Sequence, residues 1–255
     1  MSPPLPDVFL NVPIAHRALH DKADGRPENS RAAIQAAIDH GYGIEIDLQL
    51  TSDAQAVVFH DYDLARLTGQ TGTVRERSQT DLAAIPLLGA SDGIPGFAEV
   101  LDMVAGQVPL LIELKDQDGA MGPKVGPLER ATASALQTYD GPAALMSFNP
   151  HSVAMLAELA PDIPRGLTTA AFDPDNWPLS HETCTHLQSI PDYDRVGASF
   201  ISHDSNDLHS LHVADLKAKG AHILCWTIKS PEAEAKARTV AQNVTFEGYL
   251  ASHSA

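Results

Sequence analysis

The chain has 255 residues, a length that fits one large domain, and its 44% hydrophobic residues supply a core and exclude disorder over most of the chain. The formal net charge is −16, and so acidic a surface disfavours nucleic-acid and anionic-membrane partners because both are negatively charged. No apolar run approaches the roughly 18 residues of a membrane-spanning helix.

The first residues of the chain, Met1–Asp7, contain no basic side chain and no apolar stretch. They lack the features of a secretory signal peptide, so we expect the protein to be cytoplasmic. The two cysteines, Cys184 and Cys225, are too few for a disulfide framework or a zinc–thiolate cluster. Cys225 lies in an apolar run, where a small buried side chain is expected.

Short apolar runs alternate with segments of helical character along the whole chain. The runs that we interpret as strands are Val12–Arg17, Gly43–Leu50, Pro109–Lys115, Ala143–Phe148, Arg165–Thr169, Ala198–Ser202, His222–Ile228 and Val244–Leu250. The clearest helical segments are Asn29–His40, Pro150–Ala160, His209–Lys219 and Pro231–Gln242. Asn29 is the predicted N-cap of the first helix, and Gly41 is expected to end it.

This alternation predicts a parallel sheet, and eight strand–helix units are typical of a closed (β/α)8 barrel of the TIM type. An open doubly wound sheet is the main competing architecture. It usually has a glycine-rich phosphate loop after an early strand, and the sequence has none. We therefore predict an α/β fold in which residues 1–255 form a single barrel domain.

One segment departs from the alternation. The run Gly43–Leu50 is followed by the polar stretch Thr51–Gln55 and a second apolar run, Ala56–Asp61, which together predict a β-hairpin. The returning arm would be antiparallel, so it cannot be the next strand of a parallel barrel. We expect it to extend the second strand above the rim, with residues 61–106 forming an excursion before the third strand.

Acidic residues interrupt two of the runs that are predicted to be buried. Strands of a parallel sheet are usually apolar throughout, yet Glu45 and Asp47 share one face of the second run, and Glu113 shares a face with Lys115 in the third. Burying like charges together is costly without a cation. These carboxylates predict a site for a hard divalent cation, Mg²⁺ or Ca²⁺. Pairing with buried Lys or Arg side chains alone is the structural alternative.

Two of the 12 histidines end predicted strands near these carboxylates. His16, followed by Arg17, ends the first run, and His60 ends the returning arm of the hairpin. Two imidazoles on opposite sides of a phosphoryl group can act as acid and base near neutral pH, and Arg17 can bind two phosphate oxygens. The other histidines, including His20, are expected to be incidental or structural, with His203 kept as a rim candidate.

Eight short motifs follow one another in chain order: His16-Arg17, Pro27-Glu28-Asn29-Ser30, Glu45-Ile46-Asp47, Thr51-Ser52-Asp53, His60-Asp61, Ile112-Glu113-Leu114-Lys115, Ser147-Phe148 and Trp226-Thr227. Together they resemble the glycerophosphodiester phosphodiesterase family. The resemblance covers nearly the whole chain and is most specific in its N-terminal third. It implies a β/α-barrel enzyme that hydrolyses small glycerophosphodiesters to glycerol 3-phosphate and an alcohol.

The resemblance also implies roles for individual residues. The implied site consists of an acid/base pair (His16 and His60), three ligands of one divalent cation (Glu45, Asp47 and Glu113), two phosphate-binding residues (Arg17 and Lys115) and two pocket-lining residues (Phe148 and Trp226). Mg²⁺ or Ca²⁺ suits the carboxylate ligands, while the nearby His16 leaves Zn²⁺ or Mn²⁺ open. The sequence does not assign the acid and the base to particular histidines.

The chain departs from the family pattern outside these residues. Ala18 replaces the glycine that usually follows His-Arg, the loop 18–26 is longer than common, and Ala54 replaces a turn glycine. The last strand ends Phe246-Glu247-Gly248 without the usual Thr-Asp pair. These changes concern the choice of substrate more than the reaction, since rim loops are expected to recognise the alcohol.

Two other functions remain as alternatives. A membrane-active phospholipase C or D of the same barrel type is disfavoured, because the chain has no signal, basic patch or exposed apolar helix. A non-catalytic protein that binds glycerophosphodiesters would be expected to lose a histidine or a carboxylate of the site, and this chain keeps them all.

Overall fold

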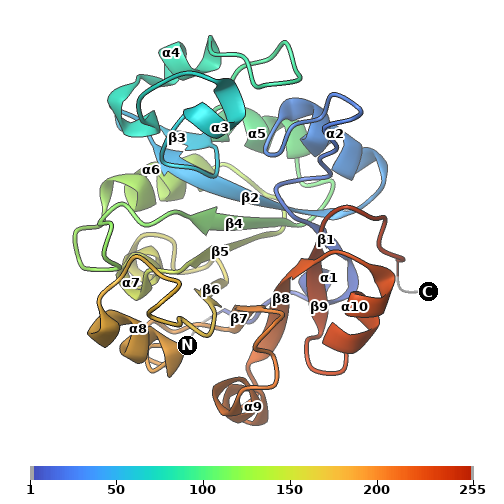
Figure 1. The fold of residues 1–255 in the computed structure, drawn as a ribbon, viewed down its shortest axis with the longest axis vertical. Coiled ribbons are helices and arrows are strands. Elements are labelled where there is room, and N and C mark those ends of the chain that lie inside the picture. The colour runs from blue at the N-terminus through green and yellow to red at the C-terminus, as the bar shows by residue number, and fades with distance from the viewer. Residues whose placement is uncertain (1–2, 254–255) are drawn as a thin grey trace.

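The centre of the molecule is a closed barrel of parallel strands, seen in a computed structural model that describes residues 3–253 (Figure 1). The barrel strands are β1 (Ile14–Ala15), β2 (Gly43–Leu50), β4 (Leu110–Leu114), β5 (Ala143–Ser147), β6 (Arg165–Thr169), β7 (Phe200–Asp204), β8 (His222–Ile228) and β9 (Asn243–Phe246). β1 pairs in parallel with both β2 and β9, which closes the sheet. The predicted (β/α)8 barrel is confirmed, and each barrel strand overlaps one of the eight apolar runs.

Helices surround the barrel because the outer faces of the strands are apolar and must be covered. The helices are α1 (Val8–Asn11), α2 (Arg31–Asp39), α3 (Ala65–Thr68), α4 (Gln79–Ala83), α5 (Phe97–Val104), α6 (Pro127–Leu136), α7 (Pro150–Leu159), α8 (His181–Gln188), α9 (Leu211–Ala218) and α10 (Pro231–Ala237), with a 3₁₀ helix, η1 (Val74–Glu76). Apolar residues between strands and helices form the main core.

The N-cap of α2 differs from the prediction. Asn29 was expected to cap the helix, but Ser30 does so, because its side chain accepts a hydrogen bond from the backbone N–H of Ala33 at 3.2 Å. Asn29 has a left-handed backbone with φ of 58°, and its side chain turns into the barrel instead. At the other end of the helix, Gly41 has φ of 70°, a conformation that suits glycine and marks the end of the helix as expected.

The predicted hairpin after the second strand is also confirmed. β3 (Ala56–Val58) runs antiparallel to β2, with Val58 opposite Leu48. The segment after β3 has a small apolar core of its own, which contains Phe59, Leu64 and Leu82. Figure 1 shows α3 and α4 of this segment above the barrel, drawn in cyan, while α5 packs against α2 and α6 in the ring of helices.

The two ends of the barrel differ. At the amino ends of the strands, Phe9 of α1 packs with inward-facing barrel residues such as Phe200 and closes the barrel. The Asn243 amide at the start of β9 donates to the carbonyl oxygens of Phe9 (2.8 Å) and Val12 (2.6 Å), which fixes this plug. Space for a ligand is therefore left at the carboxyl ends of the strands, where barrel active sites lie.

Neither cysteine forms a disulfide: Cys184 and Cys225 are both free and buried, as expected for Cys225. Within residues 3–253, none of the helices has the length and apolar character needed to cross a membrane. Met1 and Ser2, which belong to the segment considered for a targeting signal, lie outside the described residues.

Candidate active site

The nine site residues named from the sequence surround one cavity of about 60 Å³ at the carboxyl ends of the barrel strands. The cavity is lined by His16, Arg17, Glu45, Asp47, His60, Glu113, Lys115, Met146, Phe148, Thr168, Ser202, Trp226 and Thr245. Residues from distant parts of the sequence converge here because the ends of all parallel strands meet at one face of a barrel.

Three buried carboxylates form the acidic part of the cavity. Asp47 of β2 and Glu113 of β4 are direct neighbours in the sheet register, and Glu45 lies two residues before Asp47 on the same face. One oxygen of each carboxylate lies within 4.8 Å of the others, and each residue is at most 6% exposed. Oxygen ligands at this spacing are the kind that hard divalent cations prefer.

Lys115 reaches into this acidic cluster. Its Nζ lies 2.7 Å from Oδ1 of Asp47 and 2.6 Å from Oε1 of Glu113. Burial raises the pKa of Glu45 and of Glu113, and the charge of Asp47 acts in the same direction. Burial also acts to raise the pKa of Asp47, but the charge of Lys115, together with that of Arg17, opposes it and the net shift is downward.

The cluster contains more carboxyl groups than there are neighbouring cations to pair with them. Besides Lys115, only Arg17 approaches among the described residues, with its Nε 3.7 Å from Oδ2 of Asp47. Within residues 3–253, Glu45 forms no ion pair. Its Oε2 accepts a hydrogen bond from the backbone N–H of Arg17 at 2.8 Å. An unpaired buried carboxylate is costly, so a divalent cation fits the residues present, with Glu45, Asp47 and Glu113 as its ligands.

A tight turn after β1 connects the first strand to this cluster. Arg17 and Ala18 have φ of 51° and 63°, a left-handed conformation that residues with a Cβ rarely adopt. Besides the bond from Arg17, the backbone N–H of Ala18 donates to the carbonyl oxygen of Glu45 at 2.9 Å. Two hydrogen bonds to one residue of β2 thus hold the turn in which Ala18 replaces the family's usual glycine.

Two residues of the motif Pro27-Glu28-Asn29-Ser30 hold the site from outside. The Asn29 amide donates to Oδ2 of Asp47 at 2.8 Å. The Glu28 carboxylate accepts from Nη1 of Arg17 at 2.8 Å and from both terminal nitrogens of Arg66 at 2.7 and 2.8 Å. The motif itself is recognisable in the sequence. No sequence pattern indicated its contacts with Asp47, Arg17 and Arg66.

Each histidine of the cavity forms a hydrogen bond through Nδ1 to a carboxylate. Nδ1 of His16 lies 2.6 Å from Oε2 of Glu247, and Nδ1 of His60 lies 2.7 Å from Oδ1 of Asp61. Burial lowers the pKa of His16 in spite of the hydrogen bond to Glu247. Burial and then the charge of Lys115 lower the pKa of His60 to about 4. Both imidazoles are therefore neutral near pH 7, and the bond at Nδ1 leaves Nε2 free to accept a proton.

Two other histidines have surroundings that the sequence did not indicate. His20, for which only an incidental or structural role was expected, has its Nε2 3.5 Å from Oε2 of Glu247. His203, considered as a rim residue, is only 1% exposed and forms hydrogen bonds with Thr169 and Asp207, which is a structural role. No sequence pattern indicated His20, because Glu247 lies at the other end of the chain.

Aromatic side chains form the apolar part of the lining. Phe148 and Trp226 meet edge to face, with ring centroids 5.6 Å apart. Phe172 and Trp177 pack against Phe148 at 6.1 and 5.3 Å, and Nε1 of Trp226 donates to the carbonyl oxygen of Ser202 at 3.0 Å. These contacts fix the two lining rings. No sequence pattern indicated Phe172 and Trp177, which lie in the irregular segment between β6 and α8.

Three hydroxyl groups complete the lining. The side-chain oxygens of Thr168 (β6), Ser202 (β7) and Thr245 (β9) are buried and have no hydrogen-bond partner among the described residues. The same is true of Nε of Arg17. Buried polar atoms in proteins are nearly always hydrogen-bonded. These groups are therefore suited to bind a polar ligand in the cavity.

Sequence comparison relates the chain to phosphodiesterases. The model of the glycerophosphoryl diester phosphodiesterase family matches residues 16–245. The chain is 28% identical over 233 residues to YhdW of Bacillus subtilis, whose name assigns it to the glycerophosphodiester phosphodiesterases, and the match covers 88% of both chains. It is 29% identical over 163 residues to a glycerophosphodiester phosphodiesterase of Caldanaerobacter subterraneus, covering 60% of this chain and 65% of the relative.

Solved structures show the same fold. One is an Oleispira antarctica phosphodiesterase in complex with the product sn-glycerol-3-phosphate, with a TM-score of 0.74 at 23% identity over 92% of this chain and 93% of the other. Another is a glycerophosphodiester phosphodiesterase from Parabacteroides distasonis, with a TM-score of 0.72 at 22% identity over 91% of each chain. Since the family model matches most of the chain, this protein belongs to the glycerophosphoryl diester phosphodiesterase family.

Proposed function

We propose that this cavity hydrolyses glycerophosphodiesters to glycerol 3-phosphate and an alcohol, with two histidines as acid and base and one divalent cation. Family membership gives the class of reaction, which is phosphodiester hydrolysis. The observation that carries the proposal is the meeting of two neutral, carboxylate-bound histidines with three buried carboxylates around one cavity.

The proposed ligands of the cation are Glu45, Asp47 and Glu113. Mg²⁺ or Ca²⁺ is the proposed ion, because all three ligands are carboxylates. When bound, the cation supplies positive charge that neutralises the diester and polarises its phosphoryl oxygens. The proposed contacts of the phosphate oxygens are Lys115, which lies between two of the carboxylates, and Arg17, whose Nε forms no hydrogen bond within residues 3–253.

His16 and His60 are the proposed proton carriers. One accepts a proton at Nε2 from the attacking hydroxyl group, and the other donates a proton to the oxygen of the leaving alcohol. Glu247 and Asp61 hold the two rings in the tautomer with hydrogen on Nδ1. A bound phosphate makes protonation of the donor histidine more favourable, because nearby negative charge raises its pKa.

Two nucleophiles fit this arrangement. Water would give glycerol 3-phosphate in one step, whereas a hydroxyl group of the substrate's own glycerol would first give a cyclic phosphate. The proposed product is supported by the Oleispira antarctica neighbour, which holds sn-glycerol-3-phosphate. Phe148 and Trp226 supply apolar contacts for the substrate's carbon atoms.

Small glycerophosphodiesters are the proposed partners. The net charge of −16 argues against nucleic acids and anionic membranes as stable partners. A cytoplasmic location remains a prediction from the sequence.

The proposal is tested by measuring hydrolysis of glycerophosphocholine, glycerophosphoethanolamine and glycerophosphoglycerol with and without a chelator. We expect at least one diester to be hydrolysed, chelation to abolish the activity, and Mg²⁺ or Ca²⁺ to restore it. Full activity in excess chelator, with the metal content measured as nil, would contradict the role of the cation. If all three diesters bind but none is hydrolysed, whichever divalent cation is added, a non-catalytic binding protein would be favoured.

A further inference from the structure

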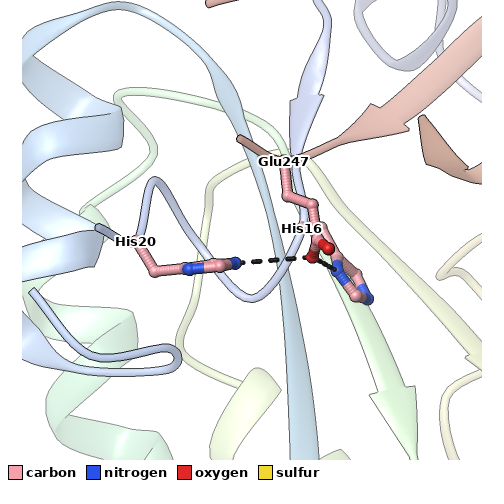
Figure 2. Close-up of side chains that lie close together, drawn as sticks. All are labelled: His16, His20 and Glu247. Carbon is pink, nitrogen blue, oxygen red and sulfur yellow. Dashed lines mark hydrogen bonds and ion pairs between the residues drawn. The ribbon is translucent and has the colours of Figure 1, made fainter. Parts of the chain in front are cut away.

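Beside the active-site cavity lies a second group of potential metal ligands. One ligand atom each of His16, His20 and Glu247 lies within 4.8 Å of the others (Figure 2). We propose that these residues form a second cation site, suited to a borderline transition metal such as Zn²⁺, whose occupation removes His16 from catalysis. The inhibitory effect rests on the proposed role of His16, whereas the binding of the metal does not.

Both imidazoles approach the same carboxylate oxygen. Figure 2 shows the Glu247 carboxylate between the two rings, with Oε2 2.6 Å from Nδ1 of His16 and 3.5 Å from Nε2 of His20. A tetrahedral Zn²⁺ with bonds of about 2.1 Å needs ligand atoms about 3.4 Å apart. The three atoms thus reach the geometry of a metal site through small side-chain movements.

The His20 nitrogen is the observation that points to a ligand. Its Nε2 is shielded from solvent, and within residues 3–253 its only ion-pair partner is Oε2 of Glu247 at 3.5 Å, a distance too long for a strong hydrogen bond. A buried polar atom without a full hydrogen bond destabilises the folded protein. A metal ion bound to the lone pair of this nitrogen would remove that destabilisation.

The second oxygen of the carboxylate is already held in place. Nζ of Lys229 lies 2.8 Å from Oε1 of Glu247, and the lysine side chain is 69% exposed. Oε1 is thus occupied from the solvent side while Oε2 faces both histidines. A partner of this kind orients a carboxylate ligand in many metal sites.

A wide cavity gives access to the cluster. About 710 Å³ of space lies beside it, lined in part by His20, Glu247 and Tyr249 and by the loop 18–26 that is longer than common in the family. Solvent in this space can deliver a metal ion and complete its coordination shell with water. The catalytic cavity is a separate and smaller space, and it is lined by His16 but not by His20.

The ligand types distinguish this site from the carboxylate cluster. Two imidazole nitrogens and one carboxylate oxygen favour Zn²⁺, Co²⁺ or Ni²⁺, whereas three carboxylates favour Mg²⁺ or Ca²⁺. Metal binding at Nδ1 of His16 requires the ring proton to move from Nδ1 to Nε2. His16 then has no lone pair free at Nε2 to accept a proton, so the acid/base cycle stops.

Metal binding is measured first, without substrate, in the variant Asp47→Asn, which weakens the carboxylate cluster. Calorimetric titration with Zn²⁺, and the visible absorption of bound Co²⁺, should show one equivalent bound at the second site. Adding His20→Ala to this variant should weaken binding at least tenfold, whereas His212→Ala, which removes an exposed histidine of α9, should not. Equal affinity with and without His20 overturns the proposal, as does the absence of any Zn²⁺ binding in Asp47→Asn.

Inhibition is measured next, with the otherwise unaltered enzyme saturated with Mg²⁺. Zn²⁺ should inhibit hydrolysis, and His20→Ala should raise the inhibitory concentration at least tenfold while the His212→Ala control responds like the wild type. Inhibition unchanged by His20→Ala overturns the regulatory part. If the enzyme hydrolyses no glycerophosphodiester, the proposed function fails, and the binding experiment still decides whether the second site exists.

Discussion

The two histidines of the cavity are held by carboxylates of different origin. The partner of His60 is the next residue, Asp61, whereas the partner of His16 is Glu247, 231 residues further along the chain. The first pair is formed by local chain geometry. The second exists only because β9 closes the barrel beside β1.

The outer contacts of the two carboxylates also differ. Nε and Nη2 of Arg66 bind both oxygens of Asp61 at 2.6 and 2.9 Å, and the same guanidinium binds Glu28. Glu247 instead has the exposed Lys229 at 2.8 Å and His20 at 3.5 Å. Because a guanidinium fork holds Asp61 at two points, we expect the His60 side to be more rigid than the His16 side. The two histidines of the proposed acid/base pair thus differ in how their carboxylate partners are held.

Removal of either imidazole should have the largest effect. We expect His16→Ala and His60→Ala each to lower kcat by about 10²–10⁴-fold, the usual contribution of a general acid or base. Steady-state kinetics give the effect, and thermal melts show that the fold is kept. Near-normal turnover in one variant would show that this histidine is not part of the acid/base pair. The carboxylate that binds it would then have no role in proton transfer.

Exchange of the carboxylate partners should have a smaller effect. Glu247→Gln and Asp61→Asn keep the shape of each side chain but lose its charge, so we expect kcat to fall by about 10–100-fold, as for outer partners of functional histidines. The nitrogen chemical shifts of the two rings, measured by NMR, should report a change of tautomer in each variant. Unchanged tautomers together with full activity would show that the carboxylates do not position the rings.

Features set by residues close together in the sequence could be predicted from the sequence. The barrel, the hairpin and the motifs around His16, Glu45 and His60 could be predicted, because strand periodicity and local spacing place them. The residues Glu45, Asp47 and Glu113 were recognisable because charge interrupts runs that should be apolar throughout. Strands and motifs that depend on short stretches of chain are thus recognisable from the sequence alone.

The contacts between distant segments could not be predicted. Glu247 stands out in the sequence only as a departure from the family pattern, and nothing in the sequence links it to His16 or His20. The sequence predicts Asn29 to be a helix cap, since its side-chain type suits both a cap and a contact with Asp47. Such pairs are fixed by the closure of the barrel, which a linear pattern does not contain.

The acid stability of the metal-free protein should reflect the buried histidines. The pKa of His60 is lowered to about 4, against about 6.5 in an unfolded chain, so the unfolded state binds more protons between these pH values. The free energy of unfolding should therefore fall as pH decreases from about 6.5 to about 4, by at most about 1.4 kcal/mol per pH unit for this group. Urea unfolding across this range measures the slope.

His60→Asn should reduce that slope, and His16→Asn should do so as well, because burial lowers the pKa of His16 too. The exposed His212 provides the control, since His212→Asn should leave the slope unchanged. A slope that is identical in the wild type and in His60→Asn would mean that His60 is protonated as easily in the folded protein as in the unfolded chain.

The smallest effects should come from replacing the cations that bind the two carboxylates. Arg66 lies on the His60 side and Lys229 on the His16 side, so the two variants compare the two sides directly. Arg66→Met should lower the free energy of unfolding by about 1 kcal/mol, because the variant leaves the buried Glu28 with Arg17 as its only ion-pair partner among the described residues. The side chain of Arg66 is 43% exposed, and solvent screening keeps the loss well below that of a fully buried pair. Lys229→Met should cost less than about 0.5 kcal/mol, as for a surface ion pair.

The control for both substitutions is Arg77→Met, which removes an exposed arginine that forms no ion pair within residues 3–253. Urea unfolding of the three variants gives the stabilities, and kcat should change less in Lys229→Met than in Arg66→Met, because Arg66 fixes both Asp61 and Glu28. Equal losses for Arg66→Met and Lys229→Met would show that the guanidinium network adds no rigidity. The two sides of the cavity would then differ only in where their carboxylates lie in the sequence.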